Sequence, residues 1–328
     1  MEFSLIILIV LALIFDLLNG IHDSSNIVAT MISSRALSPK VALAITAVAH
    51  FFGPFIFGVA VAKTIGDEIV KSGSISVGMI IAALTGAIIW NLLTWWLGMP
   101  SSSSHALIGG ICGAVVCGAG WQALKLQGFE KVLIALFASP IVGFVCGWLV
   151  IKIVCILCWN ASPKINWVLK KSQILTSIAL ALSHGTNDAQ KSMGIITLGL
   201  VTAGYLTSFV VPVWVILLCA SMIATGTAVG GWRLIRTLGA KFYKIRPVDG
   251  FSSQVASAAV ILGASLVGGP VSTTQVVSTS IMGVGAADRI NKVRWGVAGE
   301  IATAWFLTIP ATALLSAGLY LLIRYLIR

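Results

Sequence analysis

The chain has 328 residues, of which 58% are hydrophobic and 9% are charged, and its mean hydropathy is +1.02. Soluble domains carry about 25% charged residues, so this composition excludes a soluble or disordered protein and indicates an integral membrane protein. The net charge of +11 comes from basic residues in the connections between apolar runs, where membrane orientation accounts for them. We therefore expect the lipid bilayer, and no nucleic acid, as the partner of this surface.

Apolar runs broken by Gly, Pro or charged residues divide the chain into twelve segments. They lie at about residues 3–19, 26–34, 41–62, 77–97, 104–120, 132–158, 174–183, 191–203, 206–229, 255–268, 275–287 and 297–323. Four of them, 26–34, 174–183, 191–203 and 255–268, are shorter than the roughly 20 residues that a spanning helix needs. Each short run adjoins a polar cluster, and polar backbone at membrane depth persists only where it lines a cavity. These clusters are the candidates for a functional site.

Three motifs of the first half recur in the second half in the same order. The sequence GIHD at 20–23 recurs as GTND at 185–188, and TIG at 64–66 recurs as TLG at 237–239. The longer stretch GMPSSSSH at 98–105 recurs as GGPVSTTQ at 268–275. The nearly constant offset predicts two homologous repeats, residues 1–160 and 161–328.

Each repeat is predicted to contain a helix broken at its Asp motif, a crossing helix, a helical hairpin and a final crossing helix. The hairpins cover residues 77–120 and 255–287, with their turns at the Pro-Ser motifs. Three net crossings in each half turn the second half upside down. The predicted fold class is therefore an all-α polytopic membrane protein of two inverted-topology repeats with broken helices and two helical hairpins, which is typical of secondary transporters.

The distribution of basic residues predicts the orientation of this topology. Of the 21 Lys and Arg residues, 14 fall on one side of the membrane, 6 on the other and Lys191 within it. The richer side is expected to face the cytoplasm, so both termini are predicted to be external. The expected location is a cell membrane, inner or plasma, crossed several times.

Asp23 with Asn26 in the first half corresponds to Asn187 with Asp188 in the second half. A carboxylate at membrane depth costs several kcal/mol unless it is paired or solvated, so such a residue indicates function. Carboxylate and amide oxygens are hard ligands that suit Na⁺, and a carboxylate also suits H⁺. We predict a cation site of all four residues, with Asp23 and Asp188 as the metal ligands if the cation is Na⁺. Helix capping is the alternative interpretation.

Runs of hydroxyl residues follow Pro100 and Pro270, each just before an apolar helix. Hydroxyl groups and free amides at a helix N-terminus bind an anion without a basic side chain. The predicted anion-binding residues are Ser102, Ser103, Ser104, Ser272, Thr273 and Thr274. Ordinary capping of two turns is the alternative. Anion donors beside cation ligands indicate symport of an anion with a cation.

Other polar residues adjoin these motifs. Those expected to surround the two sites are His22, His105, His184, Lys191, Gln254 and Gln275. Lys191 lies one turn beyond Asp188, where an ion pair and contact with substrate both remain open. Asp16 is a candidate lining of the same path, and His50 either relays protons or is a buried, hydrogen-bonded structural residue. The consecutive residues 22–24 project in different directions and cannot form a hydrolase relay, so we expect no catalytic residue and no enzyme.

Three stretches resemble the signatures of the PiT inorganic phosphate transporter family, most of all its bacterial low-affinity members. They are NGIHDSSN at 19–26, SHGTNDAQK at 183–191 and PVSTT at 270–274. The resemblance covers essentially the whole chain and implies symport of phosphate with Na⁺ or H⁺, in some bacterial members as a metal-phosphate complex, and a homodimer. Gln275 stands where the family often has His, and many members have Glu at the places of His50 and Gln254. These departures leave the anion site intact and the coupling cation open.

Together, these patterns and the resemblance predict a secondary active transporter that imports inorganic phosphate with Na⁺ or H⁺ and needs no cofactor. A sulfate symporter on the same scaffold is one alternative. Phosphate near neutral pH carries a proton that a carboxylate can accept, whereas sulfate has none, so the two Asp residues favour phosphate. An anion channel is the other alternative, although discontinuous helices that close over one site favour alternating access.

Overall fold

The computed structural model describes residues 2–71, 73–99, 101–230 and 245–326, and these residues are largely helical. Among these residues, five helices are long and apolar enough to cross a membrane, judged by length and composition. They are α1 (Phe3–Ser33), α2 (Pro39–Phe57), α4 (Val77–Leu97), α6 (Leu126–Leu157) and α12 (Trp295–Leu326). The protein is therefore a polytopic helical membrane protein, as its composition predicts. Pro100 and the predicted repeat of 64–66 at 237–239 lie outside the described residues.

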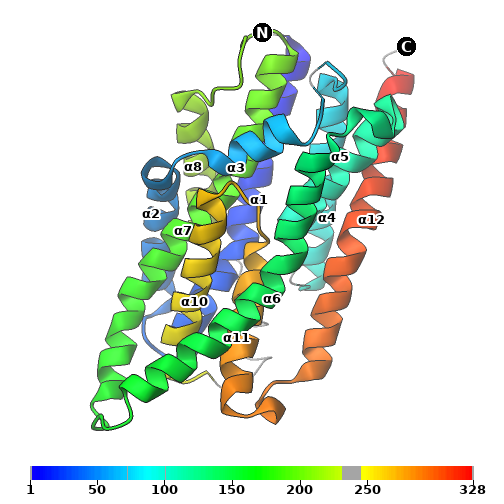
Figure 1. Ribbon diagram of the computed structural model, residues 1–328. Coiled ribbons are helices and arrows are strands. Elements are labelled where there is room, and N and C mark those ends of the chain that lie inside the picture. The colour runs from blue at the N-terminus through cyan, green and yellow to red at the C-terminus, as the bar shows by residue number, and fades with distance from the viewer. Residues whose placement is uncertain (1, 72, 100, 231–244, 327–328) are drawn as a thin grey trace.

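Shorter and more polar elements complete the chain. The first half also contains α3 (Ala60–Lys63), a π-helical turn (Thr64–Glu68), α5 (Ser103–Ala119) and a 3₁₀ turn (Trp121–Ala123). The second half contains α7 (Ile165–Thr202), α8 (Val213–Val229), α10 (Pro247–Leu266), α11 (Thr273–Asp288) and a 3₁₀ turn (Ile290–Lys292). The start of α1 and the end of α12 lie at the same end of the molecule, and α6 meets α7 at the opposite end (Figure 1).

The predicted break at each Asp motif is wrong. Helix α1 continues through residues 19–26, and α7 continues through residues 183–191, so the short runs on either side of each motif belong to one helix. The hydroxyl groups of Ser24 and Ser25 donate to carbonyls three residues earlier, at 2.8 and 2.9 Å. Such local bonds, together with partners on other helices, satisfy polar side chains without unwinding the backbone.

Helix α10 is also longer than the predicted run 255–268, because its polar first turns are helical. It begins at Pro247, where a proline costs no hydrogen bond, and Asp249 accepts from the backbone N–H of Arg246 at 3.0 Å. The two hairpins, α4 with α5 and α10 with α11, open toward opposite ends of the molecule, so their turns both lie in its interior (Figure 1).

Two helix pairs cross at glycines that leave no room for a side chain. A β-carbon on Gly20 of α1 would lie 2.3 Å from a backbone oxygen of α8, and one on Gly226 of α8 would lie 2.1 Å from a backbone oxygen of α1. The crossing of α2 with α7 has the same form, at Gly53 (2.4 Å) and Gly185 (2.5 Å). Small residues allow such close backbone approach in membranes. Each of the first two helices therefore packs against a helix of the other half.

The second helix of each hairpin also packs across the halves, α5 along α12 and α11 along α6. A β-carbon on Gly113 of α5 or on Gly283 of α11 would lie 2.0 Å from a backbone oxygen of the partner helix. Both partner helices contain an internal proline, Pro140 in α6 and Pro310 in α12. The first helix of each hairpin packs against a helix that carries an Asp motif, α4 against α1 and α10 against α7.

Candidate functional site

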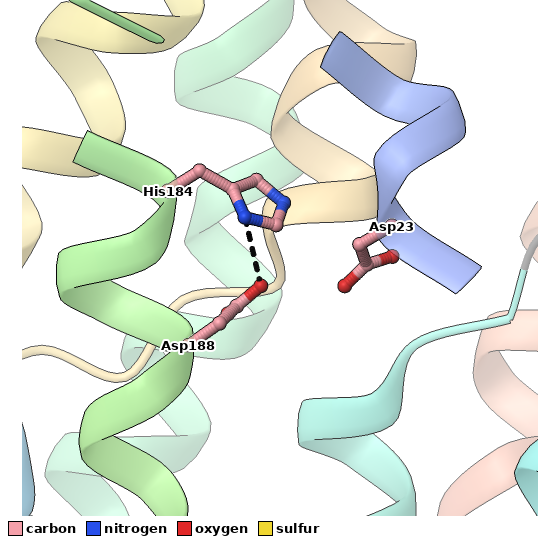
Figure 2. Close-up of side chains that lie close together, drawn as sticks. All are labelled: Asp23, His184 and Asp188. Atoms are coloured by element: carbon pink, nitrogen blue, oxygen red, sulfur yellow. Dashed lines mark ion pairs between the residues drawn. The ribbon is translucent and has the colours of Figure 1, made fainter. Parts of the chain in front are cut away.

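The carboxylates of Asp23 and Asp188 come together between α1, α7 and the start of α11. Figure 2 shows them on facing helices, and both residues are fully buried. The hydroxyl oxygen of Thr273 lies 3.0 Å from Asp188 Oδ2 and 3.5 Å from Asp23 Oδ2. A hydroxyl has one proton, so Thr273 donates to one carboxylate at a time. The two Asp motifs and the second hydroxyl run thus form one cluster.

Asp23 is held by groups from two helices. The Thr274 hydroxyl donates to its Oδ1 at 2.7 Å, and the Asn26 amide donates to the same oxygen at 2.8 Å. The Asn26 amide also lies 3.1 Å from the Thr274 hydroxyl. Among the described residues, Asn26 Oδ1 is buried without a hydrogen-bond partner. A free amide oxygen beside a carboxylate is a suitable ligand set for a hard cation.

Asp188 is bonded to a charged side chain, whereas the side chains that donate to Asp23 are neutral. The Lys191 ammonium donates to Asp188 Oδ1, and His184 Nδ1 lies 3.2 Å from Asp188 Oδ2. All three side chains are fully buried. Asp23, His184 and Asp188 each offer a ligand atom, and these atoms lie within 4.8 Å of one another (Figure 2). Of the two alternatives for Lys191, the structure therefore shows the ion pair with Asp188.

Serine residues cap the helices that leave the two hairpin turns. Ser102 Oγ accepts from the backbone N–H of His105 at 3.2 Å, and Ser272 Oγ accepts from that of Gln275 at 3.4 Å. Ser102 also lies 2.7 Å from His105 Nδ1. The capping alternative therefore holds for these two serines. In the described residues, Ser104, Thr273 and Thr274 donate to other acceptors instead.

The N-termini of α5 and α11 meet. The Ser104 hydroxyl donates to the carbonyl of Val271 at 3.0 Å, and the side-chain nitrogens of His105 and Gln275 lie 3.4 Å apart. Ser103 lies in the same first turn of α5 and is 4% exposed. The first amides of a helix have no acceptor within it, and the helix dipole adds positive potential there. Two such ends side by side are suited to an oxyanion.

Two predicted residues lie elsewhere. The Asn187 amide donates to Ser265 Oγ at 2.8 Å and to the Gly269 carbonyl at 3.2 Å, so it holds the second hairpin turn. Gln254 donates to Thr30 at 2.9 Å and accepts from Thr176 at 2.5 Å. Among the described residues, neither side chain hydrogen-bonds to the carboxylates, because each is bonded to residues of other helices or of the hairpin turn. These partners are distant in sequence, so the motifs alone do not predict them.

Several polar contacts behind the cluster involve residues that the sequence analysis did not single out. His50 Nδ1 lies 2.7 Å from the Thr227 hydroxyl, and its ring stacks on His184 with centroids 5.0 Å apart. This confirms the buried, hydrogen-bonded alternative for His50. Asp16 accepts from the Ser192 hydroxyl at 2.6 Å. Ser192 lies four residues after Asp188, a spacing that puts both on one helix face and that could have revealed it.

His22 is also close to the cluster, since its Nδ1 lies 3.8 Å from Asp23 Oδ1 and the residue is 4% exposed. The predicted residues thus divide into three groups. Those at the carboxylates are Asp23, Asn26, Asp188, Thr273, Thr274, Lys191, His22 and His184. Those at the hairpin turns are Ser102, Ser103, Ser104, Ser272, His105, Gln275 and Asn187. Gln254 stands apart.

Comparison with known proteins finds related sequences. The model of the Phosphate transporter family matches residues 19–170 and 157–316. A Bacillus subtilis (strain 168) protein named "probable low-affinity inorganic phosphate transporter" is 45% identical over 323 residues, which cover 97% of each chain. A Rhizobium meliloti (strain 1021) protein of the same name is 44% identical over 95% of this chain and 94% of its own.

A solved structure, titled "The sodium-dependent phosphate transporter", has a similar fold. Its TM-score is 0.92, and the match covers 99% of this chain and 100% of that chain at 24% identity.

Proposed function

The chain belongs to the phosphate transporter family, and from this membership we propose that it imports inorganic phosphate by symport with a cation. Its relatives are transporters and not enzymes. The observation that carries the symport is the position of Thr273 and Thr274. Their hydroxyl groups belong to an anion-binding helix N-terminus, yet they donate to Asp23 and Asp188.

Because the same hydroxyl groups serve the anion site and the carboxylates, binding of phosphate is coupled to binding of the cation. While the carboxylates are ionised and unaccompanied, they hold the hydroxyl donors and repel an approaching anion. A cation at the carboxylates, or a proton on one of them, weakens both effects and allows the hydroxyl groups to turn toward phosphate. Binding of one substrate then favours binding of the other, as symport requires.

We propose that the cation binds beside Asp23 and Asn26, with Asp188 as the second carboxylate of the cluster, and that the first turns of α5 and α11 bind phosphate through Ser103, Ser104, Thr273 and Thr274. Ser102 and Ser272 position these turns as caps, and Asn187 positions the second turn. Both Na⁺ and H⁺ suit this set of groups. The name of the solved structure of similar fold, a sodium-dependent transporter, favours Na⁺. A metal-phosphate complex as the transported species is a further form of the same proposal.

We also propose that the two halves are inverted repeats. The close-packed glycines support this, because Gly20 and Gly185 follow the offset of the Asp motifs, and Gly113 and Gly283 follow that of the hairpin turns. The hairpins open toward opposite ends (Figure 1), as inversion requires. The proposed location is the cell membrane, with both termini external. The proposed assembly is a homodimer, and measurement of the particle mass in detergent would test it.

Uptake of labelled phosphate into proteoliposomes tests the function. We expect accumulation above equilibrium when an inward Na⁺ or H⁺ gradient is imposed, and none when the gradient is dissipated. Excess unlabelled phosphate should compete and excess sulfate should not. Equal competition by sulfate would establish the sulfate alternative. Fast equilibration without accumulation under any gradient would establish the channel alternative.

A further inference from the structure

The two Asp motifs make the same contact with chemically different partners. Asn26 and Lys191 each lie three residues after an Asp, at the offset that relates the motifs. The Asn26 amide donates to Asp23 Oδ1 at 2.8 Å, and the Lys191 ammonium donates to Asp188 Oδ1. The repeat thus has a neutral donor at one carboxylate and a positive charge at the other.

The charge of Lys191 is firmly held in the cluster. Its side chain is 0% exposed, as is that of its partner Asp188. A buried ammonium is stable only with a paired carboxylate, and loss of either partner leaves an uncompensated charge. The remaining Asp188 oxygen faces the Thr273 hydroxyl at 3.0 Å and His184 Nδ1 at 3.2 Å. Asp188 is thereby supplied with donors on both oxygens.

Among the described residues, no lysine or arginine pairs with Asp23, and the nearest ring nitrogen, His22 Nδ1, lies 3.8 Å from its Oδ1. Its Oδ1 accepts from the neutral Asn26 and Thr274 groups, and its Oδ2 has, within the described part of the chain, only the longer 3.5 Å contact with Thr273. Asn26 Oδ1 is buried beside it without a partner among the described residues. Apart from its histidines, the cluster therefore contains two carboxylates and one ammonium, which leaves one negative charge to be neutralised, at Asp23.

We propose that Lys191 is a built-in counter-cation, which takes the place beside Asp188 where a second cation would otherwise bind, so that one mobile cation, bound at Asp23, accompanies each phosphate. This inference rests on the proposed symport and specifies its stoichiometry. With dihydrogen phosphate as substrate, one cation and one anion move together and the cycle carries no net charge. A neutral residue at position 191 requires a second mobile cation at Asp188, and the cycle then carries one positive charge.

The test is Lys191→Asn, which gives the second motif the residue that the first motif has at position 26. In proteoliposomes with labelled phosphate, we expect the variant to move one more positive charge per phosphate than the wild type. The Hill coefficient for cation activation should rise from close to one to close to two. Imposed membrane potential should then raise the limiting accumulation about 50-fold per 100 mV, whereas the wild type should not respond.

Lys171→Asn is the matched control, since Lys171 is an exposed lysine of the same helix beside Trp167; it should keep the wild-type stoichiometry. If the wild type shows no cation coupling, the proposed function fails. If the wild type couples one cation and folded Lys191→Asn also couples one, this inference alone is overturned, and Lys191 is then only a structural ion pair.

The reciprocal variant Asn26→Lys decides the question if Lys191→Asn does not give a monodisperse protein. A lysine at position 26 should fill the remaining cation position at Asp23. Phosphate binding should then persist without Na⁺ and change little with pH, while gradient-driven accumulation is lost. Phosphate binding by Asn26→Lys that still requires a cation would overturn the proposal.

Discussion

Replacement of Asp23 by Asn removes one carboxylate from the cluster and preserves its shape. The amide side chain then present at position 23 keeps an oxygen that can accept from Thr274 and Asn26, the groups that now donate at 2.7 and 2.8 Å. The cluster charge changes by one unit while the hydrogen-bond pattern persists. We therefore expect phosphate binding by Asp23→Asn to become independent of the cation and gradient-driven accumulation to cease.

The size of the effect follows from distance. Thr273 bridges the two carboxylates with contacts of 3.0 and 3.5 Å, and we take an anion bound at this helix end to lie about 5 Å from Asp23 for the Coulomb estimate. Two like charges at that separation repel by about 3 kcal/mol at an effective dielectric of 20. Phosphate binding without cation should therefore tighten by roughly a hundredfold in the variant, at about 1.4 kcal/mol per factor of ten.

Equilibrium binding of labelled phosphate, measured against Na⁺ concentration and pH, is the assay. Asp67→Asn is the control, because Asp67 forms a half-exposed ion pair with Lys125 at 3.7 Å, far along the chain from the cluster. Such surface pairs contribute at most about 1 kcal/mol, so this variant should bind phosphate as the wild type does. Full concentrative uptake by Asp23→Asn would refute the role of this carboxylate in coupling.

Three further predictions concern the anion site, the packing and the topology. Ser103→Ala should weaken phosphate affinity by about tenfold to a hundredfold, since a hydrogen bond to a charged group contributes roughly 1.5 to 3 kcal/mol; unchanged affinity would leave Ser103 with a structural role only. Gly226→Val should lower the thermal stability in detergent, because its β-carbon would lie 2.1 Å from a backbone oxygen, whereas Gly263→Ala, with no atom within 4 Å, should not; equal stability of both variants would contradict the packing argument. In intact cells an impermeant thiol reagent should label a single cysteine at Glu2 and spare one at Lys164, and the opposite pattern would reverse the orientation.

Much of the fold is predictable from the sequence because membrane helices need long apolar runs. The run 77–97 coincides with α4, and the run 132–158 lies almost wholly within α6 (Leu126–Leu157). The continuity of the helices through the Asp motifs was not predictable in this way, because hydropathy registers buried polar residues as interruptions. Ser24 and Ser25 instead bond to the preceding turn. Whether a polar run unwinds depends on partners that are distant in sequence.

The site residues that belong to the repeated motifs are predictable from the sequence. Repetition of the Asp motif identifies Asp23 and Asp188, and the hydroxyl run identifies Thr273 and Thr274, which the structure places at the same carboxylates. Asn187 shows the limit of this reasoning. It lies beside Asp188 in sequence, but successive residues on a helix point in different directions, and its amide reaches the hairpin turn.

The glycine crossings also bear on how the protein is made. Gly20 emerges from the ribosome about 200 residues before Gly226, which is roughly 10 to 40 s of synthesis at ordinary rates. During that interval the narrow face of α1 that α8 will cover is open to lipid or to the insertion machinery, and the same holds for α2 until α7 arrives. Neither half can complete its own packing, so the nascent chain reaches its stable form only after both have been inserted.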